Sequence, residues 1–214
     1  MVVFYFDRKS RGAISLARMA SEKGSIVVFE PSAASDPALL AEALEISHIV
    51  KIASDRQSGN EEILESKLPL LLIETLGGDG LRFKHRSSKG TGRWQKLPAM
   101  KGGTVLDTAG AGDWCTSGII SQLGSLGVCG LKSASVLQIR SSIEYGQALA
   151  AWSCCYNGAR GGMYEMPKSK VLKTVHQILE GDATPKNPGS ARGALFTSSQ
   201  PIWCDCCLTD GVSP

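Results

Sequence analysis

Residues 103–120 constrain the fold of this chain more than any other stretch. A β-branched and apolar run at 104–106 leads into a turn of small residues, and apolar residues then recur at helical spacing. This order predicts an extended segment, a tight loop and a helix. Because Gly110 and Gly112 carry no side chain, a ligand can approach the backbone closely. A helix that begins near Asp113 would add free N–H groups and a positive dipole end, which favour a bound anion.

Two common phosphate-binding motifs do not fit this loop. Cys115 occupies the third glycine position of a dinucleotide-binding Gly-x-Gly-x-x-Gly, and the chain has no Gly-Lys-Ser or Gly-Lys-Thr for a P-loop. Asp113 would stand beside the bound phosphate. A carboxylate in that place is suited to receive a proton from a hydroxyl that attacks the phosphoryl group.

The rest of the chain alternates short apolar runs with amphipathic segments. Strands are predicted at 2–6, 26–29, 48–52 and 69–74, and antiparallel edge strands at 81–84 and 94–97. Helices are predicted at 11–23, 36–44, 58–66, from about 113 to 126, 141–152 and 168–179. This alternation predicts an α/β fold with a doubly wound, mostly parallel sheet and flanking helices. Ligands of such sheets bind beyond the carboxyl ends of the strands.

Composition limits the class of protein. A chain of 214 residues with 43% hydrophobic content forms a substantial core, and we expect one domain over residues 1–182 and a disordered tail over 183–214. A net charge of +3 is too balanced for a nucleic-acid surface. No apolar run is long enough for a membrane span and no signal peptide is evident, so we expect a cytoplasmic protein.

We expect the seven cysteines and His48 to have structural roles and not to bind metal or take part in catalysis. Without an export signal, the thiols are expected to be reduced and mostly buried. Cys204, Cys206 and Cys207 lack an obvious fourth ligand, which argues against a zinc site. His48 has no neighbour at catalytic or metal-ligand spacing, so we expect it to be structural.

The loop at 107–113, Asp-Thr-Ala-Gly-Ala-Gly-Asp, followed by Ser117 and Gly118, resembles the C-terminal motif of the ribokinase-like (PfkB) carbohydrate kinase family. The resemblance implies ATP-dependent phosphoryl transfer to a hydroxyl of a sugar or sugar-like substrate, with Mg²⁺ bridging the phosphates. It implies that Asp113 is the catalytic base. It also implies an anion hole formed by the backbone of Ala109, Gly110, Ala111 and Gly112.

Other segments extend the resemblance. Residues 75–80, Thr-Leu-Gly-Gly-Asp-Gly, are similar to the nucleotide loop of the family, although a plain turn between two strands explains the glycines as well. The implied nucleotide-binding residues are Thr75, Gly77, Gly80 and Gln147. The resemblance also implies a monovalent cation such as K⁺ near Asp107 and Gly158, whereas a helix C-cap and a loop would account for the second position equally well.

The resemblance covers about residues 4–166 and is incomplete. Family members carry a sugar-binding half with a β-sheet lid ahead of this region, and the chain has no counterpart, so we expect a partial kinase. Residues 51–57 lie where many members have an Asn and a Glu that help to place magnesium. Ser54 and Asp55 are the candidates to substitute for them, although neither spacing fits cleanly. The sequence around Glu30 only partly matches the Asp-Pro-Asn turn of the family.

Two alternatives to a sugar kinase stay open. One is a non-catalytic nucleotide-binding or interaction protein that has kept the ATP-binding face. The other is a related kinase that acts on a nucleoside or a vitamin precursor. In each case we expect a small-molecule ligand and no nucleic-acid or membrane partner. The acceptor and the oligomeric state, including a homodimer, are not determined by the sequence.

Overall fold

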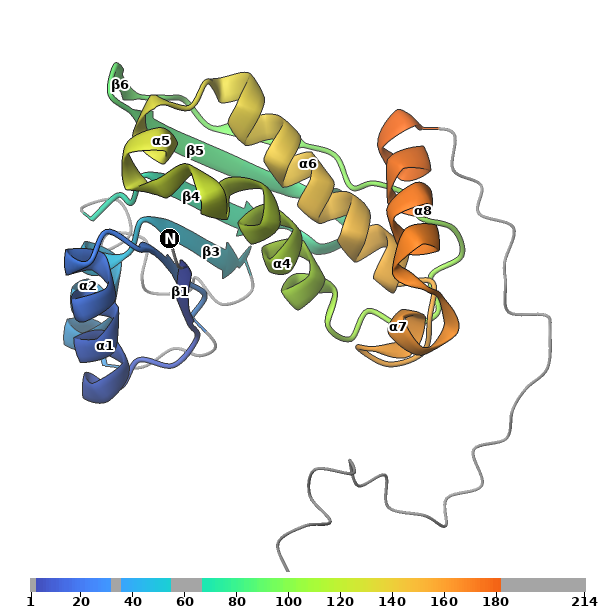
Figure 1. The fold of residues 1–214 in the computed structure, drawn as a ribbon, viewed down its shortest axis with the longest axis horizontal. Coiled ribbons are helices and arrows are strands. Elements are labelled where there is room, and N and C mark those ends of the chain that lie inside the picture. Colours follow the sequence, from blue (N-terminus) through green and yellow to red (C-terminus); the bar gives the residue numbers. More distant parts are fainter. Residues whose placement is uncertain (1–2, 32–35, 55–66, 182–214) are drawn as a thin grey trace, which may run out of the picture.

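The computed structural model describes residues 3–31, 36–54 and 67–181. In this part of the chain a mixed β-sheet lies between two groups of helices (Figure 1). The predicted helix at 58–66 and the predicted tail at 183–214 lie outside the described residues.

The sheet begins with parallel strands in chain order and continues with antiparallel strands. The parallel strands are β1 (Val3–Phe6), β2 (Ile26–Phe29), β3 (Ile49–Ala53) and β4 (Leu71–Thr75). The antiparallel strands are β5 (Leu81–Ser87), which pairs with β4, and β6 (Gly90–Thr91) and β7 (Gln95–Leu97), which both pair with β5. The predicted α/β class, with a mostly parallel sheet and flanking helices, is confirmed.

One face of the sheet is covered by the helices that connect the first strands. They are α1 (Arg11–Glu22) and α2 (Pro37–Ile46). As predicted, the side chains of Ser10 and Asp36 cap them, accepting hydrogen bonds from the amides of Ala13 at 3.1 Å and Ala38 at 2.9 Å. Both helices bury apolar residues against the outer parallel strands, including Phe29.

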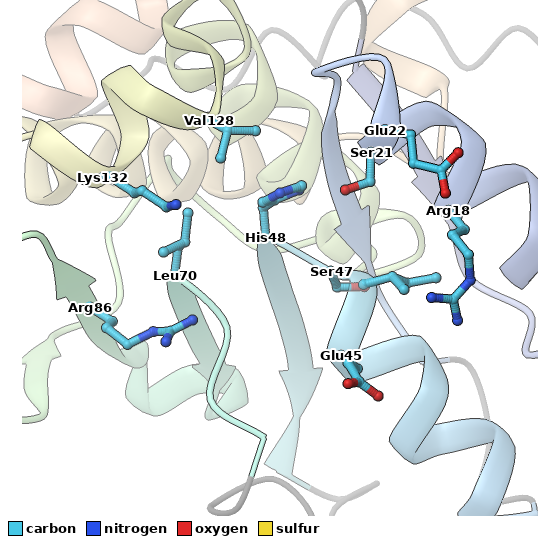
Figure 2. Close-up of a pocket in the computed structure, with 11 residues that line it drawn as sticks. Arg18, Ser21, Glu22, Glu45, Ser47, His48, Leu70, Arg86, Val128 and Lys132 are labelled. Carbon is cyan, nitrogen blue, oxygen red and sulfur yellow. The ribbon is translucent and has the colours of Figure 1, made fainter.

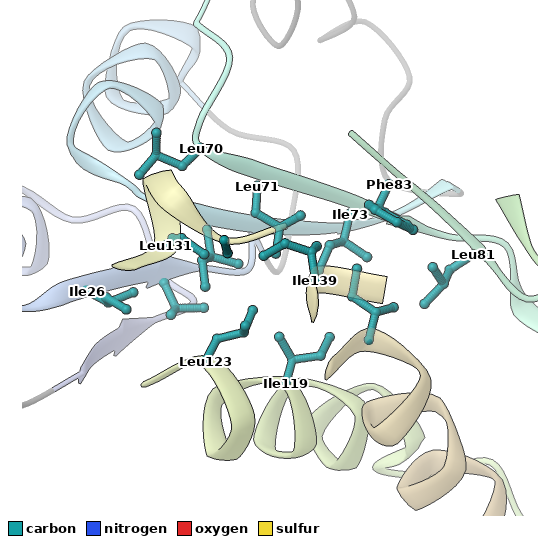
Figure 3. Packing of buried hydrophobic residues seen from close by; sticks show 14 of the residues in the cluster. Ile26, Leu70, Leu71, Ile73, Leu81, Phe83, Ile119, Leu123, Leu131 and Ile139 are labelled. Atoms are coloured by element: carbon teal, nitrogen blue, oxygen red, sulfur yellow. The ribbon is translucent and has the colours of Figure 1, made fainter. Parts of the chain in front are cut away.

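The opposite face is covered by helices that follow the antiparallel strands. They are α4 (Ala111–Leu123), α5 (Gly127–Ser133) and α6 (Val136–Ser153), with a 3-10 turn η3 (Gly124–Leu126) after α4. Figure 3 shows their leucines and isoleucines meeting those of the sheet. Further along the chain, α7 (Gly161–Glu165) and α8 (Lys168–Glu180) follow, and α8 packs on α6.

The helices on the active-site face differ most from the sequence prediction. Helix α4 begins at Ala111, directly after Gly110, whose φ of 75° ends the preceding turn. The glycine-rich continuation forms η3 and the unpredicted α5. Helix α6 begins well before residue 141, because the hydroxyl of Ser135 accepts a hydrogen bond from the amide of Gln138 at 3.1 Å and caps it.

The backbones of helices α4 and α6 lie in contact where the two helices cross. A Cβ atom on Gly118 would lie 2.6 Å from the Cα of Gly146, and one on Gly146 would lie 2.6 Å from the carbonyl oxygen of Cys115. The two glycines therefore let the backbones touch. This contact fixes the position of α4, and with it the loop that precedes the helix.

Candidate active site

The amino end of α4 lies at the carboxyl ends of the parallel strands. Gly110 immediately precedes the helix in a left-handed conformation, and Asp113 is an exposed residue of its first turn. N–H groups of a first helical turn point out of the helix end and lack helical acceptors. The structure therefore brings backbone donors and a carboxylate together at the edge of the sheet where ligands of α/β proteins bind.

The amides of the predicted anion hole are not equivalent. The amide of Ala109 donates to Oδ1 of Asp107 at 2.9 Å, and that of Ala111 donates to the carbonyl of Thr108 at 3.1 Å. Among the described residues, no acceptor is recorded for the amides of Gly110, Gly112 and Asp113, and the last two belong to the first turn of α4. We call these two donors the amide cradle. An anion at this site would be held by the cradle at the positive end of α4.

Asp107 anchors the loop instead of facing the open site. Besides the bond from Ala109, its Oδ2 accepts a hydrogen bond from the amide of Gly158 at 2.8 Å. These amide donors hold the pKa of Asp107 below its usual range, the bond from Ala109 most strongly. Each carboxylate oxygen accepts one recorded hydrogen bond, and the cation site beside Asp107 and Gly158 stays a prediction.

Further contacts lock the loop onto the turn after α6. The indole nitrogen of Trp114 donates to the carbonyl of Ala159 at 2.9 Å. A Cβ on Gly110 would lie only 2.7 Å from the Cβ of Ala159, so a larger residue at 110 would also push the two segments apart. The amino end of α4 is thus held from one side by residues distant in sequence.

A cavity of about 450 Å³ connects the start of α4 with the loop after β4. That loop contains the 3-10 turn η2 (Gly77–Asp79). The lining residues include several of the predicted nucleotide and anion contacts, namely Thr75, Gly77, Gly80, Ala111, Gly112 and Gln147. The remaining predicted site residues, Asp107, Ala109, Gly110, Asp113 and Gly158, are not among the lining residues of this cavity.

Gly80 is required by close packing of the loop. Its φ is 95°, and a Cβ there would lie 2.2 Å from the carbonyl oxygen of Leu97. Only glycine fits both conditions. The loop wall of the cavity is therefore fixed against the strand β7.

Gln147 presents an unsatisfied acceptor beside the same cavity. Its Nε2 donates to the carbonyl of Pro98 at 3.2 Å, whereas the buried Oε1 has no partner among the described residues. The assignment of the two amide atoms follows from this hydrogen bond. A buried acceptor without a donor is costly, which makes the Gln147 amide a candidate to turn toward an N–H group of a ligand.

A buried ion pair beneath the cradle was not predicted from the sequence. Lys51, in the middle of β3, pairs with Glu30 at the end of β2, and the other oxygen of Glu30 accepts a hydrogen bond from the hydroxyl of Thr116 at 2.6 Å. A Cβ on Gly112 would lie 3.6 Å from both Lys51 Nζ and Glu30 Oε1. The one available signal was a lysine inside an otherwise apolar strand.

The outer strand β1 brings a tyrosine to the same edge of the sheet. Burial raises the pKa of Tyr5, and the charges of Glu30, Asp7 and Asp113 raise it further. These groups therefore share one electrostatic environment.

The described residues contain no ready-made metal centre and no membrane span. Among them, no three His, Cys, Asp or Glu side chains converge on one point. Both oxygens of Glu30 already have a partner, Lys51 for one and the hydroxyl of Thr116 for the other. None of the helices in the described ranges combines the length and apolar character that crossing a membrane requires.

Solved structures of small-molecule kinases share this fold. An aminoimidazole riboside kinase from Salmonella enterica, crystallised with its riboside and an ATP analogue, matches with a TM-score of 0.61 and 20% identity over 81% of this chain and 63% of its own. A fructokinase from Xylella fastidiosa with bound ATP matches with a TM-score of 0.61 and 19% identity, over 77% and 56% of the two chains. A ribokinase from Giardia lamblia matches with a TM-score of 0.60 and 18% identity, over 80% and 55%.

The chain thus spans less than two thirds of each of these three kinases, 63%, 56% and 55% of their lengths. At these identities the likeness shows the fold. No curated protein sequence matches the chain. The family model of the pfkB family carbohydrate kinases, however, matches residues 17–166, which include the whole of α4, the cavity and the cradle. The chain belongs to the PfkB family of carbohydrate kinases.

Proposed function

We propose that the chain carries out ATP-dependent phosphoryl transfer to a hydroxyl of a sugar or sugar-like molecule. The observation that carries this proposal is the cavity of about 450 Å³ that leads from Gln147 and the loop after β4 to the amino end of α4. A nucleotide would place its base at the Gln147 end and its phosphates toward the amide cradle. The similar kinases crystallised with ATP or an ATP analogue support the choice of nucleotide.

At the Gln147 end of the cavity, a buried acceptor lacks a hydrogen-bond donor, and adenine carries one. The unpartnered Oε1 of Gln147 would accept a hydrogen bond from an exocyclic amine. At the other end, the amides of Gly112 and Asp113 would hold oxygens of the transferring phosphoryl group, and the positive end of α4 would stabilise their charge. When bound, Mg²⁺ would neutralise the charge of the phosphates.

Asp113 is the group that we assign to the acceptor. Its carboxylate belongs to the same helical turn as the cradle and is exposed, so an acceptor hydroxyl can reach it. It would receive the proton of that hydroxyl as the oxygen bonds to phosphorus. In a loose transition state the proton leaves late, so the reaction does not require a strong base.

A second candidate is a nucleotide-binding protein without turnover. It is favoured by the exposure of Asp113, because transfer to a sugar rather than to water requires a closed site. Both candidates predict ATP binding. Only the kinase predicts that ATP consumption accelerates when an acceptor is added.

The deciding experiment measures ATP binding by calorimetry and ADP formation with a panel of sugars, nucleosides and vitamin precursors. For the kinase, Asp113→Asn should lower acceptor-dependent turnover by orders of magnitude and leave ATP affinity nearly unchanged. Glu42→Gln, which removes a negative charge from the exposed side of α2, should leave both quantities unchanged. ATP binding without stimulation by any acceptor would favour the second candidate, and no ATP binding would contradict both.

A further inference from the structure

A second cleft lies at the amino-terminal edge of the sheet, away from the candidate active site. It has a volume of about 390 Å³, and residues that precede β3 and β4 line it together with the ends of α1, α2 and α5 (Figure 2). His48, Lys132 and Arg86 line one wall around Leu70. Nothing in the proposed kinase reaction uses these groups.

Backbone hydrogen bonds fix the relative positions of this wall. The carbonyl of His48 accepts from the amide of Leu71 at 3.0 Å, and the carbonyl of Leu70 accepts from the amide of Arg86 at 2.7 Å. The carbonyl of Lys132 accepts from the amide of Ser88 at 3.0 Å. The backbone positions of the residues that line the wall are therefore fixed relative to one another, although these residues come from three strands or strand ends and one helix.

His48 directs a hydrogen-bond donor into the cleft. Its Nδ1 accepts a hydrogen bond from the amide of Val27 at 3.0 Å, which assigns the proton of the neutral ring to Nε2. Burial, and then the charge of Lys132, lower the pKa of His48, so the ring stays neutral and keeps this tautomer at neutral pH. Among the described residues, no acceptor is recorded for Nε2.

The charges on the two sides of the cleft differ. Within the described ranges, neither Arg86 nor Lys132 lies within ion-pair distance of a carboxylate. The carboxylates of Glu22 and Glu45 and the guanidinium of Arg18 belong to the α1 and α2 side. The wall with His48 therefore offers two uncompensated cations and one neutral N–H donor, a set that suits an oxyanion.

We propose that this cleft binds a phosphate-type oxyanion between His48 Nε2–H, the Lys132 ammonium and the Arg86 guanidinium. The ligand is inorganic phosphate or the phosphoryl group of a small metabolite. The site is separate from the amide cradle, at the opposite edge of the sheet, and it does not depend on the proposed kinase activity. The carboxylates of the facing wall confine the anion to the His48 side.

The test is a titration of the full, ¹⁵N-labelled chain with inorganic phosphate at pH 7.5, followed through the His48 ring and the amides of Arg86 and Lys132. Saturable shifts at these positions are expected. Arg86→Gln and Lys132→Gln should each weaken binding about tenfold or more, the size expected of one charge-assisted hydrogen bond. Lys173→Gln, an equal charge change at an exposed position of α8, should have no effect. Both test residues are exposed, so the variants should fold.

A second arm uses glycerol phosphate in place of inorganic phosphate. Tighter binding of the ester identifies the phosphoryl group of a metabolite as the ligand, and equal or weaker binding identifies free phosphate. Shifts that do not saturate, or that sodium chloride reproduces at equal ionic strength, would overturn the proposal. So would unchanged affinity in both glutamine variants, or saturable shifts confined to the amides of Gly112 and Asp113, which report on the active site alone.

Discussion

Lys51 shows how one charged side chain can organise a site from beneath. It lies on the sheet face that α4 covers, on the same side of β3 as the core residue Ile49. Its charge is tolerated there because Glu30 pairs with it and Thr116 binds the remaining carboxylate oxygen. The network links two strands to the first turns of α4, next to the cradle.

Removal of one member of this pair should be strongly destabilising. Lys51→Met would leave the Glu30 carboxylate without the cation that neutralises it, and breaking a buried pair in this way costs about 3–5 kcal/mol of the free energy of unfolding. Urea denaturation of the wild type and the variant measures the difference. The double variant Lys51→Met/Glu30→Gln should regain part of the loss, and a double variant less stable than the single one would contradict this account.

The ring of His48 makes a second prediction at the residue scale, on pH dependence. Its pKa in the folded chain lies below the usual value of about 6.5 that applies to the unfolded chain. The unfolded state therefore binds the proton more readily. The stabilisation is complete above about pH 6.5 and is lost as the pH falls through the lowered pKa of the folded state.

The comparison of wild type with His48→Gln checks this sign. Glutamine can still accept the Val27 amide hydrogen bond but does not titrate. The free energy of unfolding of the wild type should fall more steeply between pH 7.5 and 5 than that of the variant. The charged groups around the ring, Lys132, Arg86 and Glu22 among them, are the same in both proteins. If the free energy of unfolding changed equally with pH in both proteins, His48 would contribute nothing to the pH dependence of stability.

At the scale of elements, the crossing of α4 and α6 is the contact that positions the active loop. Gly118→Ala would place a Cβ 2.6 Å from the Cα of Gly146 and 3.0 Å from Leu149 Cδ1. The helices would have to separate, at a cost of about 1–3 kcal/mol. Gly12→Ala on α1, where a Cβ would meet nothing within 4 Å, should instead stabilise the chain by up to about 1 kcal/mol.

Thermal denaturation of both variants, together with ATP titration, tests this contact. Gly118→Ala should lower both stability and ATP affinity, because the amino end of α4 moves with the helix. Gly12→Ala should leave ATP affinity unchanged. A Gly118→Ala variant as stable as the wild type would mean that the two helices have room to spare at their crossing.

Elements with a local signal were the ones that sequence patterns predicted well. The strand β2 was predictable because its residues 26–29 form one continuous apolar run, and the start of α1 because Ser10 is a capping residue next to it in the chain. The start of α6 was placed too late, since the cap at Ser135 is followed by a turn whose residues are mostly exposed and carry no clear apolar period. Helix α5 was missed because its glycines and short length resemble a loop.

At the scale of the whole molecule, the candidate site also has a part that sequence patterns predict and a part that they do not. The loop before α4 and the glycines after β4 are contiguous motifs, and part of each, Thr108, Ala111 and Gly112 from the first, lines one cavity. The Lys51–Glu30–Thr116 network joins residues 21 and 86 positions apart, so it exists only once the sheet and α4 have assembled. The anchoring of Asp107 by Gly158, 51 positions away, is equally invisible to a local pattern.

The central claim is that the first turn of α4 receives the terminal phosphate of ATP and that Asp113 faces the acceptor. A crystal structure of the chain with Mg²⁺ and a non-hydrolysable ATP analogue tests it most directly. The account predicts phosphate oxygens within hydrogen-bond distance of the Gly112 and Asp113 amides, with the base next to Gln147 Oε1. Phosphates bound away from the start of α4, or an Asp113 carboxylate turned away from them, would contradict it.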